Sequence, residues 1–362
     1  MSQNRKIAFI LLLAAIAGGI YYFGSQKARP AGSSAAEEIV NIQANSERVA
    51  EKEKKYERAK EITTPDGFLN IDKIALKELV GKKVVLVDFW TYSCINCQRT
   101  QPYLNAWYKK YREQGLEIVG IHTPEFEFEK KYENVREAVR QAGIEYPVVL
   151  DNDFSTWRAY RNQYWPRKYL IDIDGLIIYD HAGEGAYEET ERKIQEALSE
   201  RAVVLERQEE ISKDISKPEG VVEVGFSQGQ SPEVYFGADR NEFLANGKSS
   251  QEGEQDFLEF ASPAPNQLYL AGRWDITKEY AENKSKGAKI IFRYRAKDVY
   301  FVAGAEKPVN MRVLRDGQFI QNITISGFKR YTVIDGDSYG EHTLELIPET
   351  PGLQAHTFTF GS

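Results

Sequence analysis

The chain has 362 residues, of which 42% are hydrophobic and 28% charged, so it is long enough for two globular domains. Its net charge of −7, from 47 basic and 54 acidic side chains, argues against an electrostatic nucleic-acid binder. With two cysteines, Cys94 and Cys97, it cannot be a scaffold held together by several disulfides.

The first distinct segment is an apolar run from Ile7 to Phe23, preceded by Arg5 and Lys6. As a helix this run would span about 26 Å, at the short end for a bilayer crossing. No Ala-x-Ala cleavage site follows the run, and its aromatic end suits a membrane interface. We therefore predict an uncleaved membrane anchor in residues 1–27, with a cleaved signal peptide as the alternative.

Two polar stretches follow the apolar run. Residues 28–36 are small and polar, and residues 37–62 are rich in Glu, Lys, Arg and Ala. The sparse apolar positions do not keep a heptad repeat, so a solvated helical spacer is favoured over a coiled coil. We predict a linker over residues 28–62.

Residues 63–199 alternate between strand and helix patterns. Runs of β-branched and apolar residues predict strands, and apolar residues three or four positions apart predict helices. The predicted strands are Val84–Trp90, Leu116–His122, Tyr146–Asp151, Tyr169–Ile173 and Leu176–Asp180. One helix is predicted after the cysteines, and the others over Lys130–Ala142, Phe154–Tyr160 and Tyr187–Leu198.

Cys94 and Cys97 stand at the start of a predicted helix, directly after the strand Val84–Trp90. Cysteines with this spacing can approach each other, and the unpaired N–H groups of a helix N-terminus favour thiolate over thiol. Half of a zinc site is the alternative, but the four histidines contain no His-x(3–5)-His pair. The pattern predicts a redox-active Cys94–Cys97 disulfide, with no metal and no further cofactor.

After a charged stretch, interpreted as a linker over residues 200–220, the pattern changes. Short strands separated by turn residues such as Asp316-Gly317 predict an all-β sandwich or jelly roll over residues 221–362. The predicted strands are Val234–Phe236, Gln267–Ala271, Lys289–Ala296, Val299–Val302, Asn310–Arg315, Thr332–Ile334, His342–Ile347 and His356–Phe360.

The motif VDFW, followed by C-x-x-C and by a proline five residues after the second cysteine, resembles the thioredoxin superfamily. Further motifs (HTPEFEFE, DND, TWRAY, YWP and GEG) are similar to the thioredoxin-like part of DipZ-type proteins, relatives of the TlpA and ResA thiol–disulfide oxidoreductases. The resemblance runs from about Pro65 to Leu198, and more loosely from about Pro232 to the C-terminus. It implies an α/β thioredoxin-like fold with a central mixed sheet flanked by helices and a TlpA-type insertion. It also implies a C-terminal domain that is like a carbohydrate-binding module.

Roles for individual residues follow from the helix position and from this resemblance. Cys94, nearer the helix N-terminus, is the predicted nucleophile, and Cys97 would resolve the mixed disulfide. Asp88 matches the buried acid of thioredoxins, where a raised pKa suits proton exchange with Cys97; an aspartate facing water is the alternative. The resemblance implies that Pro166, after Trp165, is cis and faces the redox pair, whereas unaided statistics favour a trans proline.

Several aromatic residues are candidates for contact with substrate. Trp90 and Tyr92 are predicted to form an apolar wall beside the disulfide, with core packing as an equal alternative. Trp165 is a further candidate for contact with substrate. Pro102 is expected to be structural and to kink the redox helix. Weaker candidates for facing the site are His122, Glu125 and Glu184.

The C-terminal domain has one candidate ligand surface. Trp274, with Tyr235, Phe236 and Tyr269, could form a platform on which a sugar stacks, but packing in the core of a sandwich is the favoured interpretation. The resemblance brings a possible glycan for this domain and no certain ligand.

Taken together, these patterns predict a membrane-anchored, extracytoplasmic thiol–disulfide oxidoreductase that exchanges disulfides with envelope proteins carrying disulfides or thiols. The resemblance implies a reductant fed by a membrane electron donor of the CcdA or DsbD type. In DipZ-type proteins that donor is fused to the N-terminus, whereas here it would be a separate partner. An oxidase or isomerase role stays open.

Two other functions are alternatives to this one. A thiol peroxidase would explain Thr91, three residues before Cys94, but Val87 stands where peroxiredoxins carry proline. The other is an envelope-binding protein whose β domain binds glycan while the dithiol senses redox state.

Overall fold

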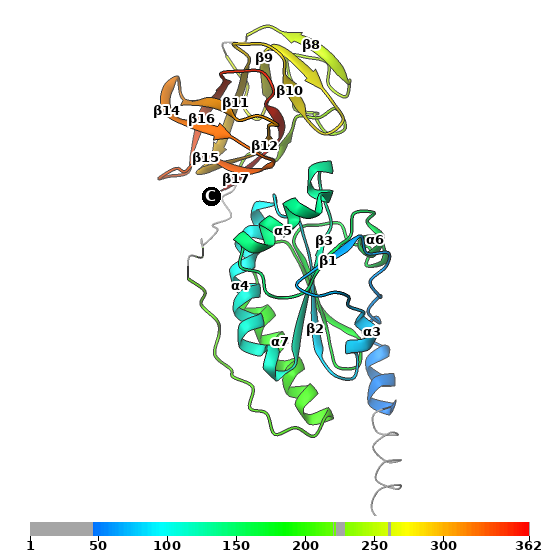
Figure 1. Cartoon of the computed structure of the whole chain (residues 1–362). Coiled ribbons are helices and arrows are strands. Elements are labelled where there is room, and N and C mark those ends of the chain that lie inside the picture. The colour runs from blue at the N-terminus through cyan, green and yellow to red at the C-terminus, as the bar shows by residue number, and fades with distance from the viewer. Residues whose placement is uncertain (1–45, 220, 222–228, 260–261, 362) are drawn as a thin grey trace, which may run out of the picture. The chain divides into compact units, whose positions relative to one another are not determined.

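The computed structural model describes residues 46–219, 221, 229–259 and 262–361 (Figure 1). Residues 57–362 form one compact unit, and an N-terminal unit ends at Tyr56. In the N-terminal unit, residues 46–53 are helical. The predicted anchor at residues 1–27 and the first part of the predicted linker lie outside the described residues. No helix in the described part of the chain is long and apolar enough to cross a membrane.

A six-stranded mixed sheet forms the centre of the thioredoxin module, which we define as residues 57–219. The strand order is β1-β4-β3-β2-β5-β6, with β2, β3 and β4 parallel and the other strands antiparallel to their neighbours. The strands are β1 (Gly67–Leu69), β2 (Val84–Trp90), β3 (Leu116–His122), β4 (Val148–Leu150), β5 (Arg167–Ile171) and β6 (Ile177–Ala182). All seven residues of β2 are buried, as expected for a central strand covered on both faces.

Helices cover both faces of this sheet (Figure 1). They are α3 (Leu76–Leu79), α4 (Ile95–Tyr111), α5 (Tyr132–Gln141), α6 (Ser155–Ala159) and α7 (Tyr187–Val204), with 3-10 turns η1 (Arg112–Gln114) and η2 (Glu127–Lys130). Val84 and Leu86 pack with α4, α5 and α7, whereas Val85 and Val87 pack on the opposite face with α3 and α6. Because strand side chains alternate between faces, Asp88 belongs to the face that α4 covers. This mixed sheet between helices confirms the predicted thioredoxin-like class.

The last helix of the module extends beyond its predicted end at Leu198. Helix α7 continues to Val204 because its final turns are held by tertiary contacts. The buried Arg201 side chain donates to the backbone carbonyls of Lys82, at 2.6 Å, and of Gln114, at 3.0 Å. Pairing of a charged side chain with distant carbonyls leaves no local pattern in the sequence.

The β module, defined as residues 229–361, is all-β. Its main ladder runs β14-β13-β16-β11-β9-β10-β17-β12-β15, with β7 added to β17 and β8 added to β9. The strands are β7 (Val234–Tyr235), β8 (Gly253–Phe257), β9 (Leu268–Ile276), β10 (Ala281–Asn283), β11 (Lys289–Ala296), β12 (Asp298–Gly304), β13 (Val309–Arg315), β14 (Gln318–Ile325), β15 (Lys329–Ile334), β16 (Gly340–Pro348) and β17 (Gln354–Gly361). The predicted all-β class is confirmed.

Strand β9 joins the two halves of this ladder. Its first residues pair with β11, and its last residues pair with β8 and β10. Between them, Gly272 has a φ of +82°, and a Cβ there would lie 2.8 Å from the Ser285 hydroxyl oxygen. Glycine therefore permits the strand to change partners and the ladder to enclose one apolar core.

Each of the eight predicted strands of the β module overlaps an observed one, whereas β8, β10 and β14 were not predicted. β10 has three residues, and most side chains of β8 and β14 lie outside the core. Their strand conformation comes from pairing with neighbours rather than from a hydrophobic alternation of their own.

Candidate active site

Cys94 caps the N-terminus of α4. Its backbone is extended, with φ −71° and ψ 120°, and its Sγ accepts a hydrogen bond from the backbone N–H of Cys97 at 3.4 Å. The cap position directs the free N–H groups and partial positive charge of the helix toward this sulfur. Cys94 is partly exposed, whereas Cys97 is buried. The two sulfurs are therefore placed for different tasks, one open to solvent and one enclosed.

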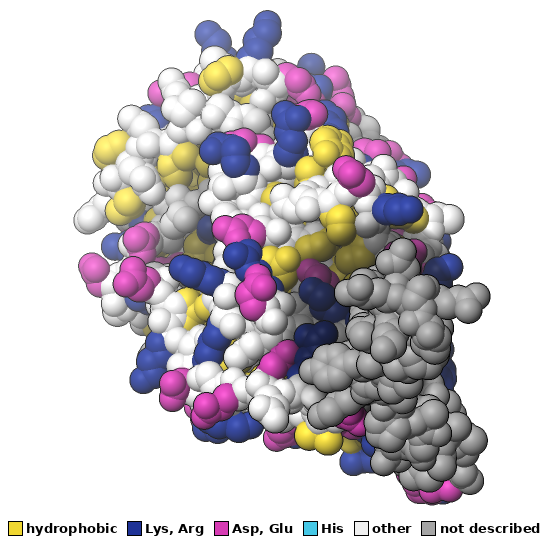
Figure 2. Space-filling model, turned by 60° about the horizontal axis from the view of Figure 1, so that its bottom comes forward, with side chains coloured by type: hydrophobic (Ala, Val, Ile, Leu, Met, Phe, Trp, Pro, Cys, Tyr) yellow, Lys and Arg dark blue, Asp and Glu magenta, His cyan; other side chains and the backbone are white. Residues whose placement is uncertain are grey.

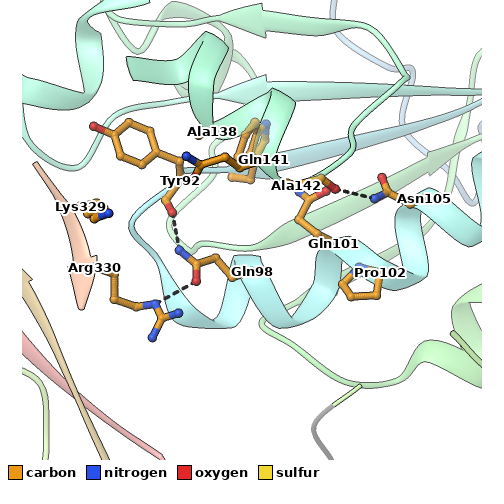
Figure 3. Close-up of a pocket in the computed structure, with 11 residues that line it drawn as sticks. Tyr92, Gln98, Gln101, Pro102, Asn105, Ala138, Gln141, Ala142, Lys329 and Arg330 are labelled. Carbon is orange, nitrogen blue, oxygen red and sulfur yellow. Dashed lines mark hydrogen bonds between the residues drawn. The ribbon is translucent and has the colours of Figure 1, made fainter. Parts of the chain in front are cut away.

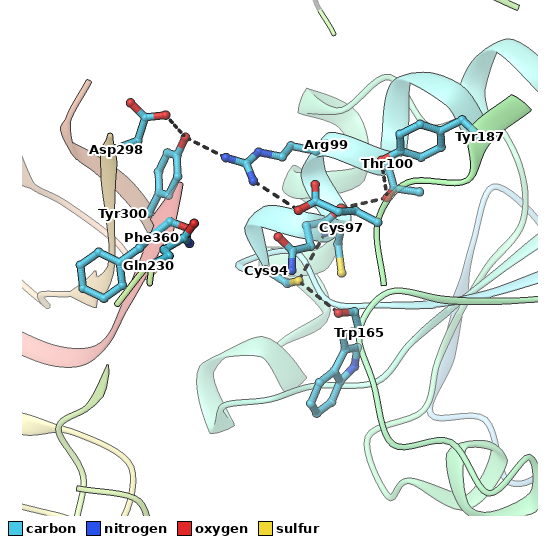
Figure 4. A network of polar contacts seen from close by, with 12 residues as sticks. Cys94, Cys97, Arg99, Thr100, Trp165, Tyr187, Gln230, Asp298, Tyr300 and Phe360 are labelled. Atoms are coloured by element: carbon cyan, nitrogen blue, oxygen red, sulfur yellow. Dashed lines mark hydrogen bonds and ion pairs between the residues drawn. The ribbon is translucent and has the colours of Figure 1, made fainter. Parts of the chain in front are cut away.

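The segment before β5 brings a second backbone group to the cysteines. The Trp165–Pro166 peptide bond is cis, and the Trp165 carbonyl oxygen lies 4.0 Å from the Cys94 Sγ (Figure 4). The Trp165 indole donates to the carbonyl of Thr123 at 3.0 Å, which holds the ring next to the end of β3. Of the predicted substrate-contacting aromatics, Trp165 is the one that lines the cleft containing Cys94.

Asp88 lies beneath the cysteines on the α4 side of the sheet. It is fully buried, and neither carboxylate oxygen has a hydrogen-bond partner. Burial raises the pKa of this carboxyl to about 7, against an opposing effect of the Lys168 ammonium. Burial also raises the pKa of the Cys97 thiol, and the neighbouring Cys94 and Asp88 add to that rise. The alternative of an aspartate facing water is excluded.

Lys168 is a residue of the site that no sequence motif indicated. It stands opposite Asp88 in the β2–β5 pairing, is buried, and donates to the Gly183 carbonyl at 3.2 Å. Burial lowers the pKa of Lys168, while Asp88, Cys97 and Glu184 oppose that change. The only local signal was a lysine two residues after Pro166, just outside the predicted strand.

Trp90 and Tyr92 are buried away from the cleft that holds Cys94. Their rings pack against the His122 ring, with centroids 5.1 Å and 5.8 Å away. They line a separate cavity of about 560 Å³ beside α4, where Gln98 and Pro102 also lie (Figure 3). The structure therefore places Trp165, but not these two aromatics, beside the reactive sulfur.

The three weaker candidates have different surroundings. His122 is fully buried, and burial lowers its pKa to about 3, so it is neutral at physiological pH. Glu125 lines the Cys94 cleft. Glu184 forms a buried ion pair with Arg99, at 3.4 Å, on the first turns of α4.

The β module contacts α4 beside the cysteines. Arg99 donates to the Tyr300 hydroxyl at 3.3 Å, and that hydroxyl donates to Asp298 at 3.3 Å (Figure 4). Arg330 donates to the Gln98 side chain at 2.8 Å. These partners are about 200 residues apart in the sequence, so no spacing pattern could have revealed them.

The favoured interpretation of the aromatic residues around Trp274, packing in the core of the β module, agrees with the structure. Trp274 is fully buried, and its indole N–H donates to the Ala271 carbonyl at 2.9 Å. Phe236 and Tyr269 are buried as well. The half-buried Tyr235 lines the Cys94 cleft, with the Arg240 guanidinium 3.7 Å from its ring centroid, so these four aromatic residues do not form one exposed platform. In the described part of the chain, no group of three or more His, Cys, Asp or Glu could hold a metal ion.

Family models built from known proteins match both modules of the chain. Residues 56–180 match the AhpC/TSA family, and residues 231–361 match the family described as thioredoxin like C-terminal domain. Protein DipZ of Mycobacterium tuberculosis is 38% identical over 310 residues, which is 83% of this chain and 43% of DipZ. The chain thus spans less than half the length of that curated relative.

Two shorter relatives match the thioredoxin module. Thiol-disulfide oxidoreductase YkuV of Bacillus subtilis is 29% identical over 39% of this chain and 93% of its own length. Thiol-disulfide oxidoreductase ResA of Bacillus cereus is 35% identical over 34% of this chain and 68% of its own length. The fold, the capped cysteine pair and these matches show that the chain belongs to the thioredoxin-family thiol–disulfide oxidoreductases.

Proposed function

We propose that the chain exchanges disulfides with other proteins through Cys94 and Cys97. The observation that carries this proposal is the Cys94 sulfur at the N-cap of α4, accepting the Cys97 N–H and opening into a cleft. A helix N-terminus stabilises the thiolate form, which is the form that attacks disulfides. The cysteine pair itself would carry the two electrons, without a further cofactor.

The exposure of the two sulfurs gives the order of steps. The Cys94 thiolate attacks one sulfur of the substrate disulfide, that bond breaks, and the other substrate sulfur leaves as a thiolate. Cys97, buried one turn along α4, then attacks Cys94, releases the second substrate thiol and closes the Cys94–Cys97 disulfide. The substrate is reduced by two electrons and the protein is oxidised by two.

Asp88 is suited to the proton transfer in the second step. Cys97 must lose its proton before it attacks, and its raised pKa makes that loss unfavourable without a base. A carboxyl with a pKa of about 7 is ionised often enough near neutral pH to accept a proton, and basic enough to hold it. Lys168 keeps that pKa from rising further.

We further propose that the catalytic unit works outside the cytoplasm, anchored by residues 1–27. The similarity to DipZ over most of this chain supports that location. In this setting the protein acts as a reductant of envelope proteins, with a separate membrane electron donor of the CcdA or DsbD type. On the face shown in Figure 2, acidic and basic side chains are interspersed, which suits protein partners better than nucleic acid.

The decisive experiment compares the two cysteine variants. Cys94→Ala should abolish insulin reduction, with a loss of at least about 100-fold, because no accessible nucleophile remains. Cys97→Ala should still attack but not resolve, so mixed disulfides should accumulate on Cys94 in an envelope extract and identify the substrates.

Turnover by Cys94→Ala close to that of the unmodified protein would refute the proposal. The match to the AhpC/TSA family suggests one further assay, which is peroxide consumption. Consumption at a rate independent of Cys97 would favour a thiol peroxidase instead.

A further inference from the structure

The cleft beside Cys94 has walls from both modules. It is a cavity of about 350 Å³, and on the thioredoxin side Cys94, Trp165 and Glu125 line it. The β module supplies the other wall, through Glu233, Tyr235, Arg240, Val302, Thr357 and Thr359. The volume is at the lower end for ligand sites, so the cleft fits a short segment around a cysteine rather than a folded surface.

Hydrogen bonds join this β wall to the thioredoxin module near the reacting sulfur. Gln98 and Arg99 of α4 bind Arg330 and Tyr300 of the β module. Within the cleft, the Glu125 carboxylate accepts from the Arg240 guanidinium at 2.8 Å. These contacts hold the β wall beside the cysteine helix.

The charges in the cleft do not cancel. The Tyr235 hydroxyl lies 3.0 Å from Glu125 and 2.9 Å from Glu233, but its single proton can be donated to only one carboxylate at a time. Glu125 also has Arg240 as an ion-pair partner. Among the described residues, no basic side chain lies within ion-pair distance of Glu233. Arg240 therefore acts on both carboxylates but is ion-paired only with Glu125, so these two carboxylates share one cation. The excess negative charge lies at Glu233, which lines the space where a substrate would bind.

We propose that the β module forms the specificity wall of the substrate cleft, and that Glu233 selects protein disulfides whose reacting cysteine has Lys or Arg as a neighbour. The inference rests on the proposed disulfide exchange at Cys94 and adds the chemical class of its substrate. A cationic side chain next to the attacked sulfur pairs with Glu233, while an acidic neighbour is repelled by the same carboxylate. The β module is thus a part of the active site.

The test measures the first exchange step with two matched peptides. Each carries one cysteine joined by a disulfide to thionitrobenzoate, and the peptides differ only in Lys or Glu next to the cysteine. Pre-reduced protein attacks the peptide sulfur and releases coloured thionitrobenzoate, while Cys97 then frees the peptide. We expect the Lys peptide to react about two- to five-fold faster at low salt, the size of one solvent-exposed ion pair, and the preference to shrink at high salt.

Three variants test whether Glu233 causes the preference for the Lys peptide. Glu233→Gln should bring the two rates together, and Glu233→Lys should reverse the preference. Glu254→Gln makes the same charge change on an exposed residue of β8, outside the cleft, and should keep the preference. Dithiodipyridine, a small uncharged disulfide, reports the intrinsic reactivity of Cys94 in each of the four proteins, so the preference is taken as the ratio of the Lys-peptide rate to the Glu-peptide rate within one protein.

The outcomes separate this inference from the proposed function. Equal rates for the two peptides, or a preference that survives in Glu233→Gln, would overturn the specificity wall while leaving disulfide exchange in place. Failure to react with dithiodipyridine as well would overturn the exchange function itself, and this inference with it.

Discussion

The two modules bury different kinds of side chains. Around its cysteines the thioredoxin module buries Asp88, His122 and Lys168, each with a pKa displaced by loss of hydration. The main core of the β module is a cluster of apolar residues. Burying a charged group is costly, so such groups are retained where chemistry or a specific contact requires them.

The buried titratable groups of the β module follow the same rule. Asp298 and His356 lie where this module meets the other one. Asp298 accepts from Tyr300, which binds Arg99. The His356 ring packs on Phe126, at 5.0 Å between centroids. The β module thus buries Asp298 and His356 where it meets the thioredoxin module, whereas the buried Asn241 and Asn283 bond within the β module itself.

The largest expected effect tests the apolar nature of the β core. Trp274→Ala should lower the free energy of unfolding by about 3–5 kcal/mol, because the indole is fully buried and its removal leaves a cavity. Denaturant unfolding measures this change. The exposed Leu258 gives a control, since Leu258→Ala should change stability by less than about 0.5 kcal/mol. If Trp274→Ala kept its stability but bound polysaccharide more weakly, a sugar-stacking role for Trp274 would be favoured instead.

The variant Asp88→Asn tests how much burial of a charged carboxyl lowers the folding stability of the thioredoxin module. The pKa of Asp88 is about 7 in the folded protein, above its ordinary value of 3.8, so the folded state keeps a proton that the unfolded state releases. Its contribution to stability is fully present below about pH 4 and is lost as pH rises through 7. At pH 8 the variant should be more stable, by at most about 4 kcal/mol, and the difference should vanish near pH 4. A gain independent of pH would contradict the displaced pKa.

The same variant has a kinetic signature. Resolution by Cys97 should slow below pH 7 in the unmodified protein, because protonated Asp88 cannot accept a proton. In Asp88→Asn the step should be slower throughout and should lose that dependence. Release of peptide from the mixed disulfide, followed by stopped flow, measures it. Identical pH profiles would exclude Asp88 as the base.

The smallest expected effect concerns the contact between the modules. A double-mutant cycle of Arg99→Gln and Tyr300→Phe should give a coupling of about 0.5–1.5 kcal/mol, the net contribution of one buried hydrogen bond. Chemical unfolding of the four proteins measures it. A coupling near zero would mean that this hydrogen bond does not join the two modules energetically.

Much of the thioredoxin module was predictable because its signals are local. The strands Val84–Trp90 and Leu116–His122 were predicted with their observed bounds, since each is a continuous apolar run in a covered sheet. Cys94 was assigned to a helix start from its spacing and lies at the N-cap. The edge strand β8 was not predicted, because most of its side chains lie outside the core and give no hydrophobic pattern.

Local sequence patterns were enough to predict two cysteines at a helix start, an acid in a buried strand, and a second domain made of short strands. The packing of the whole chain was needed to show that Trp274 lies in a core, that Lys168 stands opposite Asp88, and that the β module supplies a wall of the Cys94 cleft. The two kinds of information act over different distances along the chain. Strand alternation and helix capping act over a few neighbouring residues, whereas these contacts join side chains brought together by the packing of the whole chain.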